Sequence, residues 1–183
     1  DTLRIVEVNG LPANVGGTIT LPSGAFLTVI SNGTYSYDPN GVFDALDTGE
    51  STTDSFTYRV FDDHGGFDQA TVTLTILGVN DAPAGGDNPV TTDEDVDYVF
   101  SPSEFNFTDP DTTEVLDEVR IDTLPLSGDL LLNGNPVTAG QVISAADIAS
   151  GEFVFRPGPD EHGTTYATFE FSVGDGNAFD PAP

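Results

Sequence analysis

Short runs in which apolar and polar residues alternate recur along the whole chain. The clearest is residues 71–76, where valine, leucine and isoleucine alternate with threonine, and residues 56–60 and 169–173 repeat this period of two. A period of two places successive side chains on opposite faces of a β-strand. Each run therefore predicts a strand with one buried face and one hydrated face.

Turn-forming residues separate these runs. Clusters of glycine, asparagine, aspartate and proline lie at residues 9–10, 31–33, 38–41, 64–66, 133–136 and 157–159. Such residues favour tight turns, because glycine and asparagine tolerate a positive φ and proline fixes its own φ. Many short strands separated by turns at this spacing predict antiparallel β-sandwiches with Greek-key connections.

One short helix is expected, at residues 144–149. Ser144 is a favourable N-cap, and Asp147 stands three residues later, where it completes a capping box. The segment is long enough for one turn at most, so the expected class is all-β.

The charge of the chain narrows the choice of partners. There are 31 acidic residues against four basic ones, and the net charge is −27. Such a surface repels nucleic acids and anionic membranes and attracts cations. No apolar run approaches the roughly 18 residues of a membrane span, so direct membrane insertion is not expected. Since the chain has no cysteine, disulfides and thiolate chemistry are excluded.

The sequence also contains two divergent copies of one module. Four segments match in the same order: residues 3–5 with 119–121, 21–24 with 124–128, 33–39 with 151–157, and 56–62 with 169–175. The predicted modules are residues 1–83 and 84–183. Residues 91–113 have no counterpart in the first copy, and residues 69–77 have none in the second. The first module is therefore expected to lack its N-terminal strand and the second its C-terminal strand.

Two stretches carry a family resemblance. Residues 32–83, which end in GVNDAP, resemble the second half of a VCBS repeat, and residues 91–175, with TDEDVDYVF and FTDPD, are similar to bacterial cadherin-like repeats. The resemblance implies calcium-binding β-sandwiches strung in tandem within large bacterial surface or secreted adhesins, many of them exported with RTX-type tails. The RTX nonapeptide itself is absent.

Calcium needs six to eight oxygen ligands, which one loop rarely supplies. The junction between modules combines three sources of oxygen: the linker, an acidic loop of the first module, and acidic residues near the start of the second. The candidate ligands of Ca²⁺ are Asn80, Asp81, Glu94, Asp109, Asp111, Asp62, Asp63 and Asp95. The resemblance to cadherin-like junctions favours Asn80, Asp81, Glu94, Asp109 and Asp111.

Each candidate has a structural alternative. Asx-Pro pairs and Asp-Pro-Asp are ordinary turn formers, because aspartate bonds to its own backbone, and residues 80–83 have the alternative of being only a linker. Asp62, Asp63 and Asp175 are expected mainly to fix the loops that follow the matching strands. His64 and His162 lie in acidic, glycine-containing loops, but two histidines without a third ligand do not define a zinc site.

An enzyme is not expected. No pair of carboxylates stands out, no serine lies in a nucleophile context, and no glycine-rich phosphate loop precedes a helix. The sequence favours a calcium-stiffened extender of an adhesin, outside the cell or on the bacterial surface, whose partners are neighbouring repeats of the same chain. The alternative is an adhesive domain on the same fold that binds a cell-surface glycan or protein.

Overall fold

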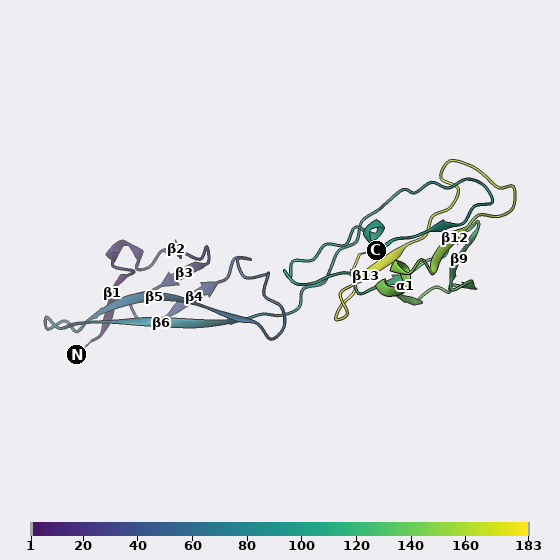
Figure 1. Ribbon diagram of the computed structural model, residues 1–183. Coiled ribbons are helices and arrows are strands. Elements are labelled where there is room, and N and C mark those ends of the chain that lie inside the picture. Colours follow the sequence, from purple (N-terminus) through teal and green to yellow (C-terminus); the bar gives the residue numbers. More distant parts are fainter. Residues whose placement is uncertain (1, 183) are drawn as a thin grey trace. The chain divides into compact units, whose positions relative to one another are not determined.

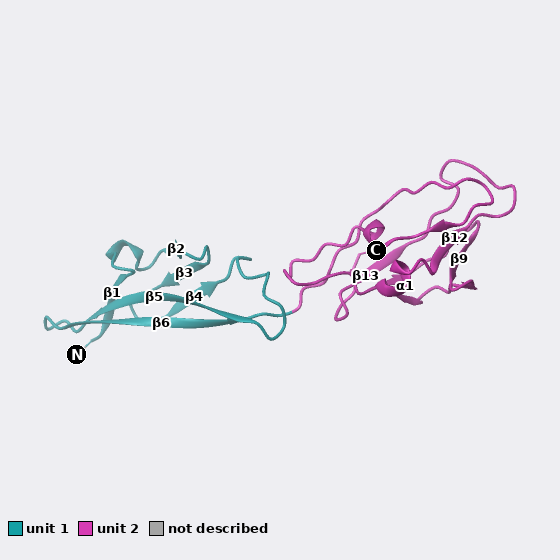
Figure 2. Cartoon of the chain, in the orientation of Figure 1, with its two compact units in different colours: residues 1–79 teal, residues 80–183 magenta. Residues whose placement is uncertain are grey.

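A computed structural model describes residues 2–182 of the chain. It divides into two compact units, residues 1–79 (unit 1) and residues 80–183 (unit 2; Figure 2). Every paired strand is antiparallel to its neighbours, so the predicted all-β class is confirmed (Figure 1). The boundary lies after Val79, whereas the sequence places it after residue 83.

Unit 1 contains two three-stranded sheets. Their orders are β1-β5-β6 and β2-β3-β4. The strands are β1 (Arg4–Val8), β2 (Thr18–Thr20), β3 (Phe26–Val29), β4 (Tyr35–Asp38), β5 (Ser51–Phe61) and β6 (Phe67–Leu77), with a 3-10 helix η1 (Pro12–Asn14) after β1. The β5–β6 hairpin stays in register over its whole length, from Ser51 opposite Leu77 to Phe61 opposite Phe67.

The core of unit 1 lies between these two sheets. Val8 of β1, Leu27 of β3 and Phe56 of β5 are buried together in one cluster, against which Val72 and Leu74 of β6 pack. The threonines that alternate with these residues in β6 are exposed. Burying an aliphatic or aromatic side chain of this size stabilises a fold by about 1.5–3 kcal/mol. The alternation in residues 71–76 thus reflects a strand at the surface of a β-sandwich.

Unit 2 also contains two sheets, with orders β10-β9-β12-β7 and β11-β8-β13. The strands are β7 (Tyr98–Val99), β8 (Glu118–Ile121), β9 (Asp129–Leu132), β10 (Asn135–Pro136), β11 (Val142–Ser144), β12 (Phe153–Arg156) and β13 (Phe171–Gly174). Their core is rich in phenylalanine: the rings of Phe100 and Phe153 stack with centroids 4.8 Å apart, and Phe105 is buried beside them.

The predicted short helix is present as α1 (Ala145–Ala149), and the Ser144 hydroxyl accepts a hydrogen bond from the Asp147 N–H at 3.1 Å. The reciprocal capping box occurs elsewhere, between Ser101 and Glu104 at the start of the 3-10 helix η2 (Pro102–Phe105). In residues 2–182 no helix is long and apolar enough to cross a membrane.

Candidate metal site

Backbone pairing holds residues 80–84 against the rest of unit 2. Ala84 and Thr108 form an antiparallel bridge with two hydrogen bonds of 2.8 and 2.9 Å, and Pro83 beside it is fully buried. Continuing this register by three residues brings Asp81 opposite Asp111, and the Asp81 N–H donates to Asp111 Oδ2 at 2.9 Å. Asn80 and Asp81 are therefore part of unit 2.

Asp109 and Asp111 enclose a tight turn around Pro110. The Asp111 N–H donates to Asp109 Oδ1 at 2.9 Å, the Asx-turn contact expected of a turn former. One oxygen of each carboxylate is left over: Asp109 Oδ2 and Asp111 Oδ1 are enclosed and accept no hydrogen bond within residues 2–182. Asp111 is only 2% exposed. A turn alone does not account for these two oxygens.

Asp175 joins this turn from the loop after β13. Its Oδ1 accepts hydrogen bonds from the N–H groups of Asn177 at 2.5 Å and Ala178 at 2.7 Å, and its Oδ2 accepts one from the Asn80 amide at 3.1 Å. Burial opposes its ionisation, but these hydrogen bonds outweigh that effect and hold the pKa of Asp175 below its usual value.

In the same surroundings the pKa of Asp109 shifts in the opposite direction. Burial raises the pKa of Asp109, and the negative charges of Asp111, Asp175 and Asp81 raise it further, while the hydrogen bond from Asp111 offsets only part of this. Both arginines of unit 2 bind other carboxylates: Arg120 contacts Asp122 at 2.6 Å and Arg156 contacts Asp97 at 2.7 Å.

We call Asn80, Asp81, Asp109, Asp111 and Asp175 the acidic cluster. Its oxygen ligands suit a hard cation such as Ca²⁺. An enclosed acceptor without a donor costs about 1–3 kcal/mol, and a cation would relieve this cost at Asp109 and Asp111. Within residues 2–182, however, no three acidic or histidine side chains already converge at metal-binding spacing.

Asp62 and Asp63 lie elsewhere, in the turn between β5 and β6. Asp62 Oδ1 accepts hydrogen bonds from the N–H groups of His64 and Gly66, both at 2.8 Å, and Asp63 contacts Arg4 at 3.2 Å. At about 3.3 Å per residue, the hairpin sets this turn roughly 30 Å from Leu77, where β6 ends. The expectation that Asp62 and Asp63 contribute to the same site as Asn80 is therefore corrected by the length of the hairpin.

Glu94 and Asp95 precede β7 and contact the loop after β12 rather than the acidic cluster. Glu94 lies 3.4 Å from His162, and Asp95 Oδ1 accepts a hydrogen bond from the Asp160 N–H at 3.1 Å. Glu94 and His162 line a cleft of about 950 Å³. Of the eight predicted ligands, the structure brings together Asn80, Asp81, Asp109 and Asp111.

The sequence predicts Asp175 only as a loop residue, and the structure adds it to the cluster. Its hydrogen bond to Asn80 spans 95 positions of the chain. The available signal was the repeat itself, which aligns Asp175 with Asp62 at the end of a matching strand. That signal marks an equivalent position in the two copies but does not reveal which residues lie opposite Asp175.

Comparisons with known proteins bear on unit 1. No curated protein and no solved structure matches the chain. The family model of the bacterial Ig domain matches residues 1–75, which run from the start of unit 1 into β6. This match does not confirm the VCBS and RTX resemblance, and it does not extend to the acidic cluster. The two facing sheets of unit 1 agree with it: residues 1–75 are similar to the bacterial Ig domain.

Proposed function

We propose that the chain is a pair of non-catalytic Greek-key modules from a bacterial surface or secreted adhesin, in which calcium bound by the acidic cluster fixes the chain where it enters unit 2. The match of residues 1–75 to the bacterial Ig domain supports the first part, because such domains are typical of surface and secreted proteins.

The observation that carries the calcium proposal is the pair of enclosed carboxylate oxygens, Asp109 Oδ2 and Asp111 Oδ1. They lie in a cluster where burial, and after it the like charges of the neighbouring carboxylates, raise the pKa of Asp109. A divalent cation supplies the missing positive charge and accepts electron pairs from oxygens that have no hydrogen-bond donor. Calcium then links Asp81, which precedes the Ala84–Thr108 bridge, to Asp109 and Asp111, which follow it.

The end of unit 1 is also held firmly. The Gly78 N–H donates to Glu50 O at 3.0 Å, and a Cβ at Gly78 would lie 2.2 Å from Asp47 O. Only Val79 separates Gly78 from Asn80 in the sequence. A calcium ion that immobilises Asn80 and Asp81 leaves few rotatable bonds in this connection, which is the property an extender needs.

Calorimetric titration of calcium into the chain tests the proposal. We expect saturable binding that Asp111→Asn weakens strongly, because a neutral amide replaces a buried charged ligand. Asp87→Asn serves as the control. Asp87 is an exposed residue of unit 2, and its substitution removes the same charge as Asp111→Asn. Equal affinity and stoichiometry in the wild type and both variants would refute binding at the acidic cluster.

Stiffening requires its own measurement. Small-angle scattering in calcium and in chelator reports whether the pair of units becomes more flexible when calcium is removed. We expect a broader distance distribution in chelator for the wild type and no calcium response for Asp111→Asn. Calcium binding without any change in scattering would retain the site but reject the extender function.

A further inference from the structure

Asp180 is a buried carboxylate that lies outside the acidic cluster. It is 7% exposed. Its Oδ2 accepts a hydrogen bond from the Gly85 N–H and its Oδ1 accepts one from the Ala182 N–H, both at 2.8 Å. Asp109 and Asp111 differ, because each keeps an enclosed oxygen that has no donor within residues 2–182. The contacts of Asp180 therefore indicate a residue that holds backbone rather than a cation.

The main chain attaches Asp180 to β13. Its N–H donates to Val173 O at 2.8 Å, next to the antiparallel bridge between Gly174 and Phe179. From this position the side chain reaches residues 80–86, which we call the entry segment. The contact is a charge-assisted hydrogen bond, which is about twice as strong as a neutral one.

Gly85 lies where the entry segment packs on β13. A Cβ at Gly85 would lie 3.3 Å from the side chains of Phe171 and Val173, so its backbone passes close to the strand. The bridge to Thr108 pairs the entry segment with the loop that leads into the acidic cluster. The hydrogen bond to Asp180 adds a second, independent attachment, because it ties the same segment to β13.

One turn thus contacts the entry segment at two points. Asp175 at the start of this turn accepts a hydrogen bond from Asn80, and Asp180 at its end accepts one from Gly85. The same spacing along the chain separates the two acceptors and the two donors. Loosening the contact at Gly85 therefore frees the segment that carries Asn80 and Asp81.

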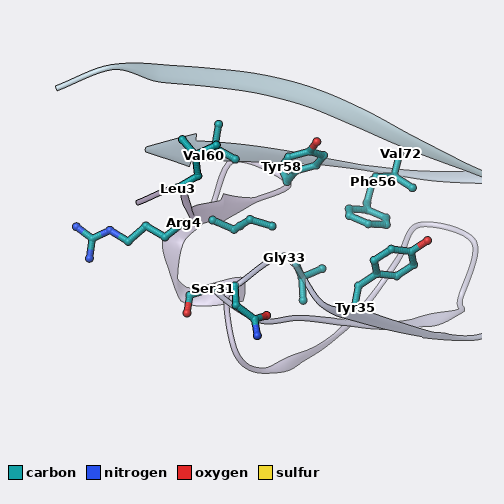
Figure 3. A pocket seen from close by; sticks show the side chains of 12 residues that line it. Leu3, Arg4, Ser31, Gly33, Tyr35, Phe56, Tyr58, Val60 and Val72 are labelled. Carbon is teal, nitrogen blue, oxygen red and sulfur yellow. The ribbon is translucent and has the colours of Figure 1, made fainter. Parts of the chain in front are cut away.

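The matching carboxylate of unit 1 is exposed. A Phe-Asp pair follows the matching strand in both modules, so Asp68 corresponds to Asp180. The Oδ1 of Asp68 accepts only a local hydrogen bond, from the N–H of the next residue at 2.9 Å. Tyr58 and Val60, the counterparts of the two β13 side chains beneath Gly85, line a groove of about 260 Å³ (Figure 3). The entry segment, rather than the sheet itself, therefore buries Asp180.

We propose that Asp180 is a positioning residue of the calcium site. It does not ligate the ion but holds the entry segment so that Asn80 and Asp81 are in place before calcium binds. This inference rests on the proposed function. When the binding-competent state is only partly populated, the apparent Kd rises in inverse proportion to its population. Asp180 raises calcium affinity because the segment does not have to be ordered at the moment of binding.

Calorimetric titration of calcium into the full chain and its variants tests this role. Asp180→Ala removes the acceptor of the Gly85 N–H, and we expect the Kd for calcium to rise about tenfold. Asp180→Asn removes the same charge but keeps a carbonyl oxygen that can accept this N–H, so it should retain most of the affinity. Asp87→Asn removes a charge at an exposed position of unit 2 and should bind calcium as the wild type does.

Amide exchange in chelator separates positioning from a general structural role. The Gly85 amide of the wild type should already be protected without calcium, because Asp180 accepts its hydrogen bond. Asp180→Ala should release this amide while the amides of β8, which is paired on both edges, stay protected. If Asp180→Ala does not fold, the exchange of the Gly85 amide in the wild type decides the question.

Each contrary result has a distinct meaning. A Gly85 amide that exchanges freely in chelator, or an unchanged Kd in Asp180→Ala, would overturn the positioning role and leave the proposed function intact. Equal weakening by Asp180→Ala and Asp180→Asn would assign the effect to charge or direct ligation and would also overturn it. No saturable calcium binding by the wild type would reject the proposed function and this inference together.

Discussion

Replacing Asp109 by asparagine should change the stability of unit 2 in opposite directions with and without calcium. Asp109→Asn keeps the Oδ1 that accepts the Asp111 N–H and replaces the enclosed Oδ2 with an amide donor. In chelator the variant removes an acceptor that has no partner and a charge that Asp111, Asp175 and Asp81 repel. We expect a gain of about 1 kcal/mol, which for a unit of this size raises Tm by about 4–8 °C.

Calcium should reverse the order of stability of the wild type and Asp109→Asn. At a free calcium concentration about 1,000 times Kd, binding stabilises the folded wild type by about 4.1 kcal/mol. The variant lacks one charged ligand and loses much of this stabilisation, so the wild type should then melt at the higher temperature. Differential scanning calorimetry in millimolar calcium and in chelator, at matched ionic strength, measures both differences.

The pH dependence provides an internal control. Because the folded state raises the pKa of Asp109, stability associated with its protonated form is present below the unfolded pKa of about 3.9 and is lost as pH rises through the folded value. In chelator, the advantage of Asp109→Asn should therefore exist near neutral pH and vanish at low pH. If the variant is more stable, or less stable, under both calcium conditions at neutral pH, the reasoning is wrong.

Three further predictions follow from individual contacts. Gly78→Ala should destabilise unit 1 by about 1–3 kcal/mol, because the new Cβ meets backbone oxygens at 2.2 and 2.5 Å, and chemical denaturation measures this loss. Asp62→Asn should leave calcium affinity unchanged in calorimetry, since Asp62 caps the β5–β6 turn; a lost site would return it to the ligand set. Glu104→Ala should lower the Tm of unit 2 through a loss of about 1 kcal/mol, because the capping box with Ser101 is removed, and an unchanged Tm would show that the box is dispensable.

The strands could be predicted from the sequence where one face is buried. Residues 56–60 and 71–76 alternate in polarity and lie inside β5 and β6. The run at 169–173 was less informative, because only Phe171–Gly174 pairs as β13. The Ser101–Glu104 capping box was not predicted, although a serine followed three residues later by glutamate is its sequence signature.

The candidate site was only partly predictable for a different reason. Asn80 and Asp81, and likewise Asp109 and Asp111, stand out locally as oxygen-bearing residues beside proline. What joins the two pairs is the Ala84–Thr108 bridge, a single long-range contact between irregular segments that carry no alternation. Local patterns contain no information on such pairing, which explains both the missing Asp175 and the misplaced Asp62.

Residue-resolved NMR during a calcium titration tests the central claim most directly. The account predicts that calcium shifts the backbone amides of Asn80, Asp81, Asp111 and Asn177 together, with one common affinity, and leaves the amides of residues 62–66 in place. Saturable shifts confined to residues 62–66 or 93–95, or no shifts at millimolar calcium, would contradict it.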